Sequence, residues 1–124
     1  MDIVYEGRQR VGRNMMSAYW LDSVDSDWMN ICKKNIESVI QYTWATTANQ
    51  EEFIQHCESK IVQYYIKQKR KDINDWLAEN KIGFMGKLGS GTLHYPYAIL
   101  LLLDTGSEAE LAFKLKYKIK AESQ

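Results

Sequence analysis

The glycine-rich segment GFMGKLGSGT, residues 83–92, contains the glycines and the lysine that a phosphate-binding loop uses. In such a loop the lysine directly precedes a serine or threonine at the start of a helix, because the hydroxyl and the backbone amides hold phosphate and its metal. Here Leu88 follows Lys87, and the apolar residues after the segment are typical of a strand. The order of residues therefore argues against nucleotide binding, and we expect a flexible connector.

Basic residues gather in three segments, 8–13, 67–71 and 114–120, and clusters of this kind are common in nucleic-acid interfaces. If the three segments share one face, they would form an anion-binding groove, with tyrosine and tryptophan stacking on bases. The alternative is a set of solvated surfaces, including a helix end at 67–71 where cations suit the negative pole. The predicted anion-binding side chains are Lys67, Lys69, Arg70, Lys71, Lys114, Lys116 and Lys118.

Side chains suited to metal binding or nucleophilic catalysis are few. Asp22, Asp25 and Asp27 lack the glycine and the distal glutamate of a calcium loop, and we expect them to cap a helix. His56 and Cys57 are adjacent, so on a helix they point about 100° apart and make a poor base–nucleophile pair. The sequence has no zinc spacing of cysteine and histidine. It therefore predicts no metal, no cofactor and no enzymatic activity.

The composition predicts a single domain over residues 1–124, since 45% of the residues are apolar and 12% are aromatic. Sixteen basic residues balance sixteen acidic ones, so no net field attracts nucleic acid or an anionic membrane. The longest apolar run, 97–103, is far shorter than the roughly 20 residues of a membrane helix, and the first residues lack the apolar run of a signal peptide. We expect a cytoplasmic protein with Cys32 and Cys57 reduced in the core, and a disulfide between helices is the alternative.

The most regular pattern is helical and covers the middle of the chain. A first helix is predicted from residue 25 or 26 to about residue 44, because apolar side chains recur there every three or four residues. A second begins near Asn49, which forms a capping-box pattern with Glu52. It continues to residues 80–83, as one helix or as two with a kink near Asp72. The apolar stripe of the first helix consists of Met29, Cys32, Ile36, Val39, Ile40 and Thr43.

Several large side chains of the first helix lie beside this stripe rather than on it. Ile31 and Tyr42 widen the stripe, which predicts contact with more than one neighbour. Trp28 and Trp44 are also off the stripe, and tryptophan is favoured at binding hot spots. We therefore expect Trp28 and Trp44 to be anchors for a protein partner, with burial in a compact core as the alternative.

The region before the first helix has weaker signals. Residues 3–5 are prone to form a short strand, and residues 6–13 resemble a loop. Residues 15–21 are expected to begin a helix or to form a separate helical turn.

A C-terminal β-hairpin is predicted from residues 95–103 and 109–119. Apolar residues alternate strictly with lysines over most of the second segment, which is typical of a strand with one buried face. With Leu103 opposite Ala109, the larger apolar side chains of both strands point to one face, and a one-residue slip would break this agreement. Residues 104–108 supply the turn.

The reverse face of this hairpin would carry a small apolar patch that includes Ala98, Leu100 and Leu102. Burying the two leucines is worth roughly 3–6 kcal/mol, so we expect something to cover them. The N-terminal residues 3–5 could pack there or extend the sheet, a second copy of the chain could stack its own patch, or a different protein could dock. Ala98, Leu100 and Leu102 are therefore predicted partner-binding residues, and cover within the same chain is the alternative.

Together these elements predict an α+β fold with two or three helices packed on one face of a small antiparallel sheet that contains a C-terminal β-hairpin. The leading hypothesis is a non-enzymatic protein-binding protein, such as a small inhibitor, immunity-type protein or adaptor, that acts through the apolar sheet face and helix aromatics. In one form of this hypothesis, the partner is a second copy of the chain and a homodimer forms through the sheet. The second hypothesis is a nucleic-acid-binding protein that uses the three basic segments. The third is an enzyme whose site assembles around His94, Cys57 and the glycine-rich segment.

Overall fold

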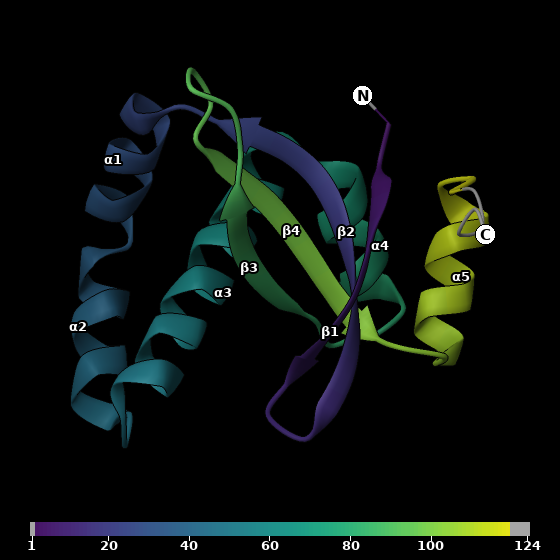
Figure 1. Cartoon of the computed structure of the whole chain (residues 1–124), viewed down its shortest axis with the longest axis horizontal. Helices are drawn as coiled ribbons and strands as arrows, with labels where there is room; N and C mark the ends of the chain where they lie inside the picture. Colours follow the sequence, from purple (N-terminus) through teal and green to yellow (C-terminus); the bar gives the residue numbers. More distant parts are fainter. Residues whose placement is uncertain (1, 120–124) are drawn as a thin grey trace.

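The computed structural model describes residues 2–119, which form helices and one four-stranded antiparallel sheet (Figure 1). The elements are β1 (Val4–Val11), β2 (Asn14–Val24), α1 (Ser26–Asn35), α2 (Glu37–Thr46), α3 (Gln50–Lys69), α4 (Lys71–Glu79), β3 (Met85–Ser90), β4 (Tyr97–Asp104) and α5 (Glu108–Lys116). The predicted α+β class is confirmed, and a hairpin is present in the C-terminal half, formed by β3 and β4.

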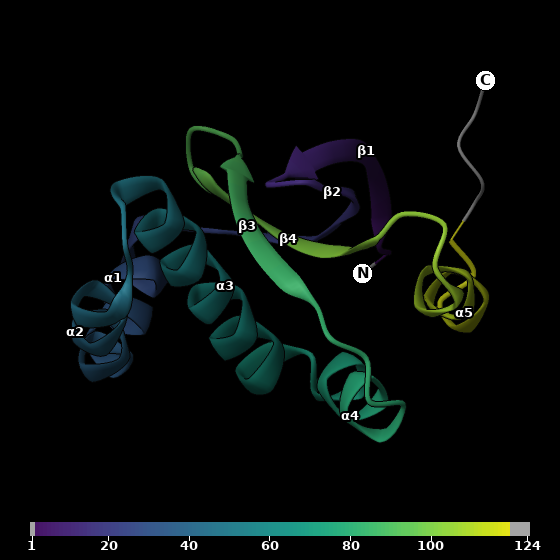
Figure 2. The same ribbon diagram turned by 90° about the horizontal axis from the view of Figure 1, so that it is seen from below.

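The strand order is β1-β2-β4-β3, and α3 packs against β3 and β4. Figure 2 shows α3 and α4 below the sheet and α5 to one side of it. The helices α1 and α2 lie beyond α3 and pack mainly against it. They therefore form an outer layer that the sheet does not cover.

The inner strand β4 is buried on both faces, which explains why residues 98–103 are all apolar. Ile99, Leu101 and Leu103 belong to the main core, which the strands share with the helices. The alternate residues of β4 point to the opposite face, and they are buried as well.

That opposite face is covered because the sheet is strongly curled. Lys87 Nζ on β3 donates a hydrogen bond to Gln9 Oε1 on β1 at 2.8 Å, although β2 and β4 lie between these strands. In a flat sheet, strands three places apart are about 14 Å apart. The curl encloses a second apolar cluster, which consists of Met16, Ala18, Leu102, Val11 and Met85. The cover is therefore the intramolecular one, and the N-terminal segment extends the sheet as β1.

The predicted pairing of residues 95–103 with residues 109–119 is wrong. β4 pairs with β2 and β3, and residues 108–116 form α5. The Ser107 side chain caps this helix by accepting a hydrogen bond from the Glu110 N–H, and good helix formers fill the following turns. These local preferences outweigh the period-two alternation.

The alternating residues of this segment therefore do not share one face. Phe113 is buried in the core, whereas Leu111 and Leu115 are exposed on the outer side of α5. Lys120, the last residue of the basic segment 114–120, lies outside the described residues.

Two further predictions are wrong because polar and glycine-rich segments form strands. Residues 6–13 and 15–21, expected as a loop and a helical segment, form most of the β1–β2 hairpin. Gly12, with a φ of 62°, supplies the left-handed conformation in its turn. Residues 83–92, expected as a flexible connector, contain β3, which pairs with β4 along its length.

The two helical regions are confirmed, and each contains one break. Ile36, with a φ of −110°, separates α1 from α2, and Arg70, with a φ of −134°, separates α3 from α4 near the expected kink. The Ile36 N–H donates to the Cys32 carbonyl oxygen and the Ile40 N–H to that of Ile36. These bonds continue the helical pattern, so α1 and α2 form one kinked rod.

The helix α3 closes the β3 edge of the sheet. Ser59 Oγ accepts a hydrogen bond from the Gly86 N–H at 3.0 Å and donates to the Gly86 carbonyl oxygen at 3.3 Å. Glu58 Oε1 accepts a hydrogen bond from the Leu88 N–H at 3.3 Å. Covering outward-pointing backbone groups in this way prevents unwanted strand pairing. The other edge strand is β1.

Replacing Ser59 with alanine is expected to lower the free energy of unfolding by about 1–3 kcal/mol, because Gly86 then keeps a buried N–H and C=O without partners. Urea denaturation measures the change. Ser38→Ala, at an exposed position of α2, is the matched control and should cost nothing measurable. If both variants were equally stable, the Ser59 hydroxyl would have no part in closing this edge.

Candidate protein-interaction surface

The α1–α2 rod rests on α3 through a narrow buried stripe. Asp25 starts α1 by accepting a hydrogen bond from the Trp28 N–H at 2.8 Å, as an N-cap residue does. Thr43 is the only buried residue of α2, so this helix contributes little to the core. The other buried side chains of the rod are Met29, Cys32 and Ile36.

Most large side chains of α2 are exposed to solvent. Tyr42 is 70% exposed and Trp44 is 67% exposed. Val39 lies three residues before Tyr42 on the same flank of the helix, whereas Trp44, two residues after Tyr42, projects from the opposite flank. Ile31 of α1 is also exposed. We name these four residues, Ile31, Val39, Tyr42 and Trp44, the α2 ridge.

The Trp44 ring is oriented by a contact with α3. Its centroid lies 5.0 Å from that of Phe53, at an interplanar angle of 83°, which is an edge-to-face arrangement. A side chain that is already oriented loses less conformational entropy on binding. Trp44 is therefore suited to the anchor role that the sequence predicted.

Trp28, the other predicted anchor, packs inward. Its ring centroid lies 6.1 Å from that of Tyr64 and 5.7 Å from that of Tyr65. The Tyr65 hydroxyl in turn donates a hydrogen bond to Asp22 Oδ2 at 2.7 Å. Trp28 therefore joins α1 to α3 near the end of β2 and offers little surface to a partner.

The three predicted partner-binding residues of the sheet have almost no accessible surface. Ala98 is 5% exposed, Leu100 9% and Leu102 2%. They were expected on an open face because residues 109–119 were expected to pair with β4, and that pairing does not exist. The expected sheet-face site is therefore wrong. Exposed large apolar side chains lie instead on helices, among them Leu111 and Leu115 of α5 and those of the α2 ridge. Tyr42 and Ile31, which the sequence placed beside the helix stripe without assigning them a site, belong to this ridge.

Two of the three basic segments approach each other. Arg70 and Lys118 line one cleft of about 600 Å³, together with Tyr117 and the first described residues of the chain. The remaining segment, 8–13, lies on β1 and its turn, at the other end of the strand from Val4, which lines this cleft.

Three of the predicted anion-binding cations already have carboxylate partners, at nitrogen–oxygen distances of 2.6 to 4.0 Å. The pairs are Arg70–Asp72, Lys71–Asp75 and Lys114–Glu110. The exposed side chains Lys67, Lys69 and Lys116 have no such partner among the described residues. Within residues 2–119, the basic side chains therefore do not form a continuous groove of the kind that a nucleic-acid backbone occupies.

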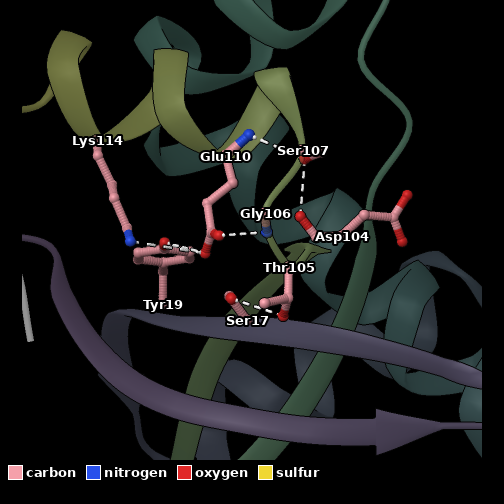
Figure 3. Close-up of polar contacts among 8 residues, drawn as sticks. All are labelled: Ser17, Tyr19, Asp104, Thr105, Gly106, Ser107, Glu110 and Lys114. Carbon is pink, nitrogen blue, oxygen red and sulfur yellow. Dashed lines mark hydrogen bonds and ion pairs between the residues drawn. The ribbon is translucent and has the colours of Figure 1, made fainter.

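A buried carboxylate ties α5 to the sheet (Figure 3). Tyr19 Oη on β2 donates a hydrogen bond to Glu110 Oε2 at 2.5 Å, and the Gly106 N–H donates to Glu110 Oε1 at 2.9 Å. Lys114 Nζ lies 4.0 Å from Glu110 Oε2. The Ser17 and Thr105 hydroxyl oxygens, 2.9 Å apart, lie beside this group.

The Glu110 carboxylate is ionised and is held by hydrogen bonds from the sheet and the turn. Burial alone would raise its pKa, but the surrounding hydrogen-bond donors and the Lys114 ammonium outweigh burial and lower the pKa. Burial and the bond to Glu110 raise the pKa of Tyr19, so its hydroxyl stays protonated as the donor. The Glu110 side chain is only 7% exposed.

Within residues 2–119, no three side chains of histidine, cysteine, aspartate or glutamate gather where they could hold a metal. In the same range, no helix combines the length and apolar character needed to cross a membrane. Both cysteines are free thiols, and burial raises the pKa of Cys57, which opposes a nucleophilic role. The chain matches no protein-family model, no curated protein and no solved structure.

Proposed function

We propose that the chain is a non-enzymatic protein-binding protein, of the inhibitor, immunity-protein or adaptor type, whose α2 ridge docks into an apolar groove of a different protein. The observation that supports this most is the exposure of Tyr42 and Trp44 on a helix that buries only Thr43. Tyrosine and tryptophan are enriched at binding hot spots. A helix that is apolar on two flanks fits a groove better than a flat surface.

The energetic scale of such docking is adequate. Each aromatic side chain can bury about 150–250 Å², and Tyr42 and Trp44 retain about two thirds of that area in solvent. Covering both rings would contribute about 5–8 kcal/mol at ~25 cal/mol per Å². This offsets much of the loss of translational and rotational freedom on association, which is at least about 4 kcal/mol.

Replacing both Tyr42 and Trp44 with alanine is expected to abolish partner binding without destabilising the fold. Purified wild-type and variant proteins would be used to capture proteins from an extract of the native host, with quantitative mass spectrometry as the readout. We expect one protein to be retained by the wild type and lost at least about tenfold by the double variant, since each hot-spot residue contributes about 2 kcal/mol or more. The melting temperature should change little, because both side chains are exposed.

Tyr95→Ala is the matched control, since Tyr95 is 53% exposed on the turn between β3 and β4, away from α2. It should capture the same protein as the wild type. Capture that persists at high salt supports an apolar interface, whereas a steep loss with salt would indicate nucleic acid. Equal capture by the wild type, the double variant and the control would overturn the proposal. If the wild type sediments as a dimer and the double variant as a monomer, the ridge mediates self-association instead.

A further inference from the structure

Besides the cleft lined by Arg70 and Lys118, a second cleft opens between the end of β1 and the first half of α3. It is separate from the α2 ridge. Its volume is about 700 Å³, which is within the range of pockets that hold small ligands. Residues 9–12 of the β1 end and its turn line one side, and residues 49–58 line the other. Gly86, Lys87 and Leu102 of the sheet lie between them.

The charges that line this cleft are balanced in number and separated by element. Arg10 of β1 and Lys87 of β3 are basic, whereas Glu51 and Glu58 are both on α3. No ion pair within 4.0 Å joins any two of these four side chains in the part of the chain described. Opposite charges thus line one cleft without neutralising each other directly.

Glu58 has few partners for a carboxylate in its position. Its Oε1 accepts one hydrogen bond of 3.3 Å from the Leu88 N–H, and no donor to Oε2 is seen in the described residues. Burial raises its pKa, and the Leu88 N–H and Lys87 offset this only in part. A ligand ammonium group would donate to Oε2 and add to the partial counter-charge that Lys87 provides.

The cleft also has an apolar part. Ile54 of α3 is 47% exposed, and it lines the cleft together with Val11 and Leu102. An apolar ligand side chain would remove this surface from water, which is favourable.

We propose that this cleft binds short peptides in their zwitterionic form, with the peptide ammonium at the α3 carboxylates, the peptide carboxylate at Arg10 and an apolar side chain against Ile54. A ligand of one sign is disfavoured, because two of the four charged groups would repel it. A di- or tripeptide carries both charges at opposite ends and fits a cleft of this volume. The site does not include the α2 ridge, so its failure would leave the proposed function untouched.

Isothermal titration calorimetry with three peptides tests the proposal. The probes are Ala-Leu-Ala, its N-acetyl form, which lacks the ammonium, and its C-terminal amide, which lacks the carboxylate. The wild type is expected to bind Ala-Leu-Ala at least about tenfold more tightly than either blocked form, because each blocked form lacks one charge-assisted hydrogen bond.

Two conservative variants identify which wall recognises which end. Glu58→Gln keeps an oxygen to accept the Leu88 N–H, and it should lower the affinity for Ala-Leu-Ala to that of the acetylated peptide. Arg10→Gln should lower it to that of the amide. Glu79→Gln, at the exposed end of α4, should behave as the wild type.

Three outcomes would overturn the proposal. One is the absence of any heat of binding with Ala-Leu-Ala up to about 10 mM, a concentration at which even weak binding would be detected. Another is equal affinity for the blocked and unblocked peptides. The third is an equal effect of Glu58→Gln, Arg10→Gln and the control Glu79→Gln.

Discussion

Replacing Glu110 with alanine is expected to lower the free energy of unfolding by about 3–5 kcal/mol. The buried Tyr19 hydroxyl would lose its acceptor, and a buried unsatisfied group costs about 1–3 kcal/mol. The N–H of Gly106, an exposed turn residue, would also lose its bond to the carboxylate, and a hydrogen bond to a charged group contributes about 1.5–3 kcal/mol. The contact that aligns α5 with β2 would also be lost. Thermal denaturation should show a melting temperature lower by about 10–20 °C, at roughly 3–5 °C for each kcal/mol in a domain of this size.

Glu108→Ala is the matched control, because Glu108 is an exposed glutamate two residues earlier on the same helix. It should cost less than about 1 kcal/mol, from the loss of a negative charge at the helix N-terminus. Tyr19→Phe tests the same bond from the other side, and its effect should not add to that of Glu110→Ala, since both remove one interaction. A small loss for Glu110→Ala, or full additivity, would contradict this role.

The same carboxylate makes stability depend on pH in one direction. The folded-state pKa of Glu110 is lowered, whereas in the unfolded chain it should lie near ~4.3. Its contribution is therefore present above the unfolded-state pKa and is lost as the pH falls through the folded-state pKa. As the pH falls, the free energy of unfolding should decrease less steeply for Glu110→Gln than for the wild type. Identical pH dependences of the free energy of unfolding would show that Glu110 is not responsible.

Gly86→Ala is expected to destabilise the protein by about 2–4 kcal/mol, because an added β-carbon has no space. It would lie 2.3 Å from Val62 Cβ and less than 3 Å from both Val62 methyl groups. Val62 is fully buried in α3, so the helix must move away from β3 to relieve the overlap. That movement would also lengthen the two hydrogen bonds between Ser59 and Gly86.

Gly83→Ala is the control for the loss of backbone freedom alone. A β-carbon at Gly83 has no atom within 4 Å, and its φ is not in the left-handed region. In urea denaturation, the free energy of unfolding of Gly83→Ala should therefore equal that of the wild type or be slightly higher. If Gly86→Ala were as stable as Gly83→Ala, the close packing of α3 on β3 would be wrong.

The sequence predicts the helical middle of this fold well, because amphipathic periodicity and capping act locally. Most of the stripe from Met29 to Thr43 is buried as expected and Asn49 caps α3, whereas Val39 of the stripe is exposed. The same local logic explains the error at residues 108–116. The Ser107–Glu110 capping pattern and the helix-forming composition were present in the sequence, but strict alternation suggested a strand.

The strands β1 and β3 were hidden for a different reason. β1 contains Glu6, Arg8 and Arg10, and β3 contains Gly86 and Gly89, so neither has the composition of a strand. Their stability comes from long-range pairing with β2 and β4 and, for β3, from the side chains of α3. Such contacts between distant segments leave little trace in a local pattern.

The candidate surface was predicted in part. Trp44 was identified because an aromatic residue lay off the helix stripe, and the same signal at Tyr42 and Ile31 was interpreted only as a wide stripe. The apolar character of β4 is plain in the sequence, but its cover depends on the curl of the sheet, to which β1, β2 and β3 all contribute. The cleft beside Glu58 could not be foreseen, since its walls come from segments about 40 residues apart in sequence.

The closed β3 edge also limits how copies of this protein can polymerise. A fibre that grows by strand addition needs two available edges on every molecule, one for each neighbour. Because α3 occupies the β3 edge, only β1 could accept a strand among the strands described. Two molecules joined at β1 would use up both open edges. Strand addition should therefore produce dimers at most in concentrated solution, and no filaments.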